Sequence, residues 1–234
     1  MIHLLRAAAL LGISVLIVKL FATGQMALYM SPSLDPLTAL TGVASGCLGL
    51  WELRAAVRRR AEHEPLSLDH ALTVGLVLVP VALGLITTPR ALDSSALGGQ
   101  DLSRLVLAYP SPPGTSGVRP LTSAEAPDIF SFLRQAGGAG MGQQVRAVGM
   151  VAHSSSLQPG QFVLLRYSIV HCVADARPIG VLVLGDASAW QADEWVEVRG
   201  TLDVHEQDGE YLVALRASSL AATDEPANPY LPPI

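Results

Sequence analysis

The chain has 234 residues, of which half are hydrophobic and only 15% are charged, and its mean hydropathy is +0.40. Soluble domains usually carry about 25% charged residues, so this balance argues against a wholly soluble protein, and the high apolar content excludes a disordered chain. Two cysteines exclude a disulfide scaffold, and the net charge of −5 gives no sign of a nucleic-acid binder. The composition predicts a membrane protein with a modest soluble part.

Three apolar blocks lie within residues 1–89, the predicted transmembrane region, at about 4–21, 36–53 and 71–88. Each approaches the ~20 residues that cross the hydrocarbon of a bilayer. A cleaved signal peptide is the alternative for the first block, but Lys19 near its end and the absence of a good cleavage site favour a retained span. Lys19 itself either snorkels to the interface or pairs with a partner's carboxylate, and we favour snorkelling.

Arginines predict the orientation of these blocks. Arg54 and residues 58–60, which are all arginine, lie between the second and third blocks, whereas residues 31–35 between the first two contain no base. Loops rich in Lys and Arg stay in the cytoplasm. The amino terminus is therefore predicted to be cytoplasmic, and the chain after Thr88 extracytoplasmic.

The second block contains glycines at a spacing that brings helices together. Gly42 and Gly46 form a GxxxG motif, and Gly49 extends the same face. Small residues at this spacing allow two helix backbones to approach closely in lipid. We expect this face to pack on another helix.

The remainder of the chain changes character. Residues 90–121 are rich in Pro, Gly and Ser and predict a linker. A leading helix is expected to begin near Pro127 and to end at Gly137. Five runs with strand-like alternation follow, and the Asp-Gly pair at 208–209 predicts a hairpin between the last two. The sequence therefore predicts a small five-stranded OB-like β-barrel over residues 122–222, with a C-terminal tail at 223–234. The fold class is a membrane-anchored α+β protein with three N-terminal transmembrane helices.

Specific runs resemble a known family. The segment Arg166–Gly180 (RYSIVHCVADARPIG) is similar to the signature of the YcgQ-like bacterial membrane proteins. Further matches are Tyr29–Pro32, Pro89–Ser95, Trp195–Gly200 and Glu225–Tyr230. Members of this family are described as permease subunits encoded beside a multi-span permease. The resemblance implies a multi-pass location in the bacterial cytoplasmic membrane, and it leaves the biochemical activity of the family open.

The signature run also holds the candidate metal ligands. This chain has His171 where the family has the first cysteine of a pair, and imidazole and thiolate both bind zinc or copper. His171, Cys172 and Asp175 are the candidate ligands, although adjacent side chains in a strand point to opposite faces. In the alternative interpretation Cys172 is a small buried residue, and Asp175 and Pro178, followed by Gly180, form the turn between the second and third strands.

Sequence motifs of nucleophilic, metalloprotease or phosphate-binding chemistry are not found, so we expect no enzymatic activity and, apart from zinc or copper, no cofactor. Residues 122–234 contain six Arg against thirteen Asp and Glu, a balance that repels nucleic acid. The predicted function is an accessory subunit that docks in lipid on a multi-span permease and places its OB-like domain at the outer mouth. The alternative is a membrane-anchored metal-binding or metal-sensing extracytoplasmic domain.

Overall fold

The computed structural model describes residues 2–58, 68–97, 130, 142–154, 156–207 and 209–232. The chain divides into two compact units. The helical unit contains Met1–Arg90 together with His171–Val173, and the sheet unit contains Ala91–Val170 and Ala174–Ile234. Residues 98–121 of the linker predicted at 90–121 and, apart from Phe130, the predicted leading helix lie outside the described residues.

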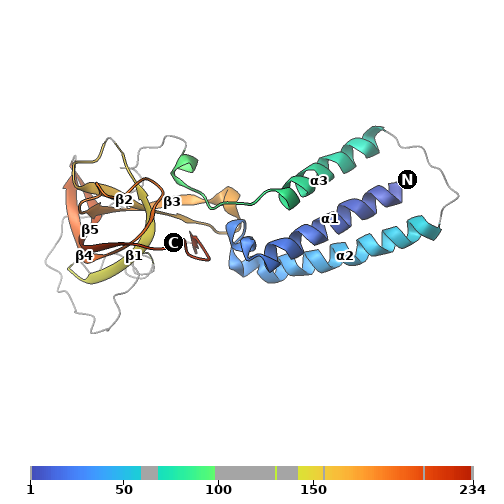
Figure 1. The fold of residues 1–234 in the computed structure, drawn as a ribbon, viewed down its shortest axis with the longest axis horizontal. Helices are drawn as coiled ribbons and strands as arrows, with labels where there is room; N and C mark the ends of the chain where they lie inside the picture. Colours follow the sequence, from blue (N-terminus) through green and yellow to red (C-terminus); the bar gives the residue numbers. More distant parts are fainter. Residues whose placement is uncertain are drawn as a thin grey trace. The chain divides into compact units, whose positions relative to one another are not determined.

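Over its described residues, the helical unit has three α-helices and two short 3-10 turns. Gly24 ends the first helical segment with a left-handed φ of 69°, a conformation that glycine adopts without strain. Asp35 begins α2, where its carboxylate favours the positive end of the helix dipole. Figure 1 shows α1 and α2 side by side. The elements are α1 (Ile2–Ala22), η1 (Gln25–Leu28), η2 (Pro32–Leu34), α2 (Asp35–Arg58) and α3 (Leu68–Ile86).

The prediction of three transmembrane helices is wrong. Among the described residues, one helix is long and apolar enough to cross a membrane, His3–Ala22 in α1, with a mean hydropathy of 2.2. In α3 only Gly75–Ile86 forms a shorter apolar helix. The physical reason in α2 is its composition, because small and polar residues such as Thr38, Thr41 and Ser45 interrupt its apolar side chains.

The sheet unit is a six-stranded mixed sheet in the order β1-β4-β5-β3-β2-β6, and β1 also pairs with β2. Parallel pairing joins β3 to β5 and β2 to β6, whereas the other pairs are antiparallel. Figure 1 shows these strands around a common core. The strands are β1 (Gln144–Ala152), β2 (Gln161–Ser168), β3 (Arg177–Leu184), β4 (Trp195–Gln207), β5 (Glu210–Ala222) and β6 (Tyr230–Leu231).

The predicted five-stranded OB-like barrel is therefore also wrong, because a sixth strand belongs to the sheet and the sheet is mixed. The sixth strand, β6, comes from the predicted C-terminal tail. Two residues are too few to show the period-two alternation that predicts a strand. The separation of helices and strands along the chain is consistent with the predicted α+β class.

Alternating side chains build the core of the sheet unit. In β4, every second residue from Val196 to Leu202 is buried, and Glu197, Arg199 and Thr201 between them are more exposed. Between β4 and β5 the register shifts at Arg199 and Gly200. A Cβ at Gly200 would overlap the backbone carbonyl of Arg216, so this close approach of two strands requires glycine.

Candidate functional site

Arg166 on β2 fixes the end of the chain. Its side chain is buried and stacks over the ring of Trp195, with 5.2 Å between the guanidinium carbon and the ring centroid. Nε donates to the carbonyl oxygen of Pro229 at 2.9 Å, Nη1 to that of Val148 at 3.1 Å and Nη2 to that of Asn228 at 3.4 Å. Carbonyl oxygens and an aromatic face thus compensate for burying the cation. Arg166, in the signature segment Arg166–Gly180, thus holds the signature segment Glu225–Tyr230.

The next side chain of β2, Tyr167, binds a different signature segment. Its hydroxyl donates to the carbonyl oxygen of Asp93 at 2.8 Å, and the Tyr230 hydroxyl accepts from the backbone N–H of Leu92 at 3.2 Å. Burial, aided by the negative charges of Asp93 and Asp193, raises the pKa of Tyr167 to about 12. Burial also raises the pKa of Tyr230. Both phenols therefore stay neutral at physiological pH and can serve as hydrogen-bonding groups.

Asp193 completes the attachment of this segment. Its carboxylate accepts from the backbone N–H of Ser94 at 2.7 Å and from the Ser94 hydroxyl at 3.0 Å. Asp193 has a φ of 70°, a conformation in which Asp is enriched among non-glycine residues. Leu97 is buried beyond these contacts. Residues 91–97, which follow α3 and a short connection, are therefore part of the sheet unit.

Within the helical unit, the signature segment Tyr29–Pro32 meets His171–Val173 of the segment Arg166–Gly180. Met30 and Cys172 form an antiparallel β-bridge. On either side of it, the N–H of Ser31 donates to the carbonyl of His171 at 3.0 Å, and the N–H of Val173 donates to that of Tyr29 at 2.8 Å. Met30 and Cys172 are thus a non-hydrogen-bonded pair, the kind in which facing side chains lie closest. The five signature segments now each have a structural place. Segment Arg166–Gly180 lies mostly in the sheet unit and enters this bridge through His171–Val173, Tyr29–Pro32 lies in the bridge, and the other three lie wholly or mostly in the sheet unit.

The structure places the predicted metal ligands on one short connection between β2 and β3. His171 is exposed and Cys172 is partly exposed, so Cys172 is not a core residue. Asp175 ends the turn η5 (Val173–Asp175), where its carboxylate accepts from the N–H of Val170 at 3.0 Å. Across the described part of the chain, no group of three or more His, Cys, Asp and Glu side chains is arranged to hold a metal ion.

The other predicted turn residues lie inside a strand. Pro178 and Gly180 belong to β3, opposite Tyr167 and Leu165 of β2. Of the predicted turn set, Asp175 alone sits in the connection itself.

The glycine face of α2 packs against α1 of the same chain. A Cβ at any of the three glycines would come within 2.9 Å of an α1 side chain, so the two backbones approach closely. The facing pairs are Gly42 with Ile17, Gly46 with Ser14 and Gly49 with Leu11. Because this face is occupied within the chain, a partner protein would have to contact a different face of α2.

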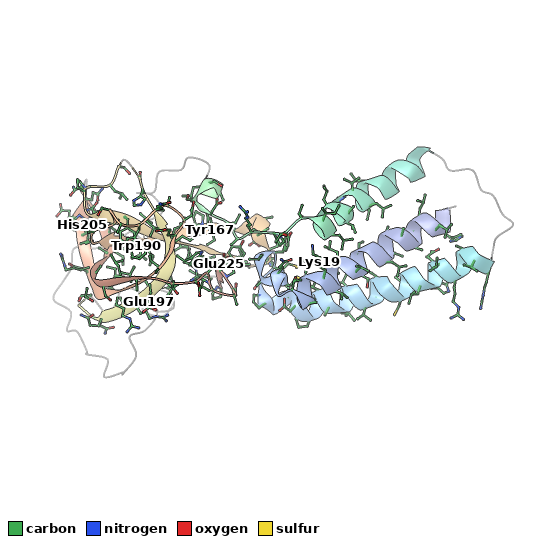
Figure 2. The ribbon with its side chains drawn as sticks, viewed as in Figure 1. Lys19, Tyr167, Trp190, Glu197, His205 and Glu225 are labelled. Atoms are coloured by element: carbon green, nitrogen blue, oxygen red, sulfur yellow. The ribbon has the colours of Figure 1, made fainter. Side chains whose placement is uncertain are left out.

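Lys19 joins α1 to the end of α3 (Figure 2). Its ammonium donates to the carbonyl oxygens of Gly84 and Leu85, both at 2.9 Å, and to that of Thr87 at 3.1 Å. A cation at the carboxyl end of a helix satisfies carbonyls that have no intrahelical partner and complements the helix dipole. This role was not anticipated, because sequence gives no indication that α1 and α3 meet at this level.

Large apolar side chains cover the outward faces of the helical unit. On α2, Leu40, Val43 and Trp51 are each about two-thirds exposed, at 65%, 64% and 65%. On α3, Leu76 and Ile86 reach 78% and 81%. Monomeric soluble proteins rarely expose apolar patches of this extent, which mark contact with lipid or with another protein.

These features define a membrane-associated protein: an apolar helix of membrane-spanning length, an apolar outer surface on the helical unit, and a separate sheet unit. The chain belongs to the YcgQ-like DUF1980 family. The DUF1980 N-terminal domain matches residues 5–102, and the DUF1980 C-terminal domain matches residues 124–232. The resemblance carried by the signature runs is thereby confirmed.

Two relatives are informative. A protein of Streptococcus mutans serotype c, named "Putative two-component membrane permease complex subunit", is 24% identical over 249 residues, covering 89% of this chain and 92% of its own length. The UPF0703 protein YcgQ of Bacillus subtilis is 25% identical over 94 residues, covering 39% of this chain and 33% of its own length.

Proposed function

We propose that this protein is a non-catalytic accessory subunit of a membrane permease complex and that its helical unit docks on the permease. The observation that carries the proposal is the exposed apolar surface of α2 and α3, which the part of the chain that the structure describes does not cover. A relative matched over nearly its whole length bears the name of a permease complex subunit. In lipid, close packing and not the hydrophobic effect drives helix association, so the partner is a membrane protein with a complementary surface.

The proposed orientation has the amino end of α1 in the cytoplasm. Arg6, Arg54 and Arg58 support it, because they lie toward the same end of the antiparallel α1–α2 pair and positive residues favour the cytoplasmic side. The bridge between Met30 and Cys172 lies beyond the opposite end of α1. This location supports an extracytoplasmic sheet unit, placed at the outer mouth of the permease.

The test is co-purification of the tagged full-length chain from native membranes in a mild detergent. We expect a multi-span membrane protein to be recovered at a fixed ratio. Val43→Trp should reduce that recovery severalfold, because it enlarges an apolar side chain on the outward face of α2 while keeping the helix apolar.

Val15→Trp on α1 is the matched control, since Val15 is also exposed, at 55%, but lies on another helix. If the wild-type chain recovers no multi-span partner, the proposal is wrong. If both variants recover the partner at the wild-type ratio, this face of α2 is not the docking surface.

A further inference from the structure

The end of α2 carries a basic and aromatic surface for which the proposed function names no ligand. Trp51, Arg54, Ala55 and Arg58 line a surface cavity of about 400 Å³. These residues recur at helical spacing on one side of the helix. Trp51, Arg54 and Arg58 are all exposed, and the described residues place no carboxylate in an ion pair with either arginine.

The level of this cavity follows from the packing of α2 on α1. The facing pairs Ile17 with Gly42 and Leu11 with Gly49 make the helices antiparallel, with paired residue numbers summing to about 60. Extended by two turns, this register puts Arg54 beside Arg6 and Arg58 beside the first residues of α1. The contact between the His3 ring and the Glu52 carboxylate, at 2.6 Å, holds the two helices together at this end.

With α1 across the membrane, as the proposed function requires, this level is the boundary between hydrocarbon and lipid headgroups. The candidate membrane helix begins at His3 and has 20 residues, and 20 helical residues span about 30 Å, the thickness of the hydrocarbon. Arg54 and Arg58 therefore bracket the depth at which lipid phosphates lie, and an arginine side chain can extend toward that depth from either side. Trp51 lies one turn deeper, where indole rings concentrate at membrane interfaces.

We infer that this cavity binds the phosphate of an anionic phospholipid, with Arg54 and Arg58 on the phosphate and the Trp51 ring against the glycerol and upper acyl chains. Guanidinium groups recognise phosphate oxygens in a two-pronged geometry. The exposed side chain of Leu48, about one turn from Trp51 along α2, gives the acyl chains an apolar surface to follow.

The test uses the full-length chain in detergent micelles that contain equal amounts of phosphatidylglycerol and phosphatidylcholine with the same acyl chains. Native mass spectrometry measures which lipid stays bound. We expect a preference for phosphatidylglycerol that falls by roughly an order of magnitude in the double variant Arg54→Gln/Arg58→Gln, given the usual contribution of a basic residue near anionic lipid. Trp51→Leu should lower retention of both lipids.

The control is Arg199→Gln/Arg216→Gln, which removes two exposed positive charges from the sheet unit and should keep the preference. Equal losses in the two double variants, or no loss in either, would overturn the inference. Displacement of the lipid by excess inorganic phosphate would show a site for free phosphate instead and would overturn the lipid assignment.

If the arginine variant does not fold, the wild-type chain and Trp51→Leu still decide the question. A preference for phosphatidylglycerol that does not weaken with added salt, together with unchanged retention in Trp51→Leu, contradicts the inference. Extraction of the wild-type chain from membranes by alkaline carbonate would instead refute the membrane location on which the proposed function also rests, so the two failures are distinguishable.

Discussion

The sheet unit and helix α2 of the helical unit bury opposite kinds of residue. In the sheet unit the fully buried side chains are large and apolar, such as Phe162, Leu164 and Leu182. In α2 of the helical unit the buried residues are small, Gly42, Ser45 and Gly49, whereas the large apolar side chains of that helix point outward. Burial of large apolar groups is what water imposes on a folding chain.

The outer faces differ as well. On the sheet unit Glu197 accepts hydrogen bonds from Arg199 at 2.7 Å and from Arg146 at 2.8 Å, and these bonds lower the pKa of Glu197. Asp203 pairs in the same way with Arg216. The sheet unit thus presents charged pairs to water, whereas the helical unit presents large apolar side chains, as the contact with lipid and a membrane partner that we propose for it requires. Three substitution experiments sharpen this comparison.

The largest effect is expected where a glycine faces rigid backbone. Gly200→Ala puts a methyl group onto the carbonyl of Arg216, which cannot move without separating β4 from β5. Such overpacking should cost about 3 kcal/mol. In the helical unit, Gly46→Ala meets only the Ser14 hydroxyl, which can rotate, so the cost should be about 1 kcal/mol.

Thermal unfolding of the full-length chain in detergent, followed by circular dichroism, measures both. Gly75→Ala is the control, because nothing lies within 4 Å of the added Cβ and alanine favours a helix. If Gly46→Ala lowers the stability as much as Gly200→Ala, the α1–α2 contact is as rigid as the β4–β5 contact. The expected difference in packing between the two units would then be contradicted.

A smaller loss of stability is expected when either of two cations that bind backbone carbonyls is replaced, one in each unit. Arg166 and Lys19 each donate to three backbone carbonyls. Arg166→Met leaves buried carbonyls without donors near β6 and removes the stacking on Trp195, which should cost about 2–3 kcal/mol. Lys19→Met should cost about 1–2 kcal/mol, since the last of its three bonds is exposed.

Hydrogen exchange read by mass spectrometry separates the two. Arg166→Met should accelerate exchange at residues 228–231 and leave α3 unchanged, whereas Lys19→Met should accelerate exchange at the end of α3 alone. Lys19→Arg, which keeps the charge and its donors, should restore much of the protection. Acceleration of exchange in both regions by either variant contradicts the assignment of one cation to each unit.

Local sequence patterns correctly predicted part of the sheet unit. The alternation in β4 and the Asp-Gly pair before β5 correctly indicated two adjacent strands joined by a hairpin, with Gly209 at a φ of 81°. Strand β6 was not predicted because its two residues are held by pairing with β2, and Arg166 holds Pro229 just before it; both are tertiary effects. The roles of Tyr167 and Asp193 were missed for the same reason, since their partners lie about 74 and 99 residues away in the chain.

In the helical unit, counting apolar residues was misleading. The blocks at 36–53 and 71–88 do form helices. Over its described residues, however, neither is both long enough and apolar enough to be a candidate membrane span. The spacing of the glycines was more informative than the apolar content of the blocks. The interval of Gly42, Gly46 and Gly49 indicated a face for close packing, and the structure shows α1 against it. The identity of that neighbour depends on how the chain folds back, which no local pattern encodes.

The smallest effect concerns alkaline pH in the sheet unit. The pKa of Tyr167 is raised from 10 in the unfolded chain to about 12 in the folded one. A raised pKa favours the protonated form in the folded state, so its stabilising contribution is complete below pH 10 and is lost as the pH rises from 10 to 12. At pH 11 the loss should be about 1 kcal/mol. Ionisation would also remove the proton that Tyr167 donates to Asp93.

Tyr167→Phe should therefore be less stable than the wild type at pH 8, but its stability should fall less between pH 10 and pH 12. Denaturant unfolding of the full-length chain across this range measures the difference, and the ultraviolet absorbance of tyrosinate should show one late-titrating group that the variant lacks. Parallel stability curves for the two proteins above pH 10 would mean that Tyr167 titrates normally and does not hold residues 91–97 in the way the geometry indicates.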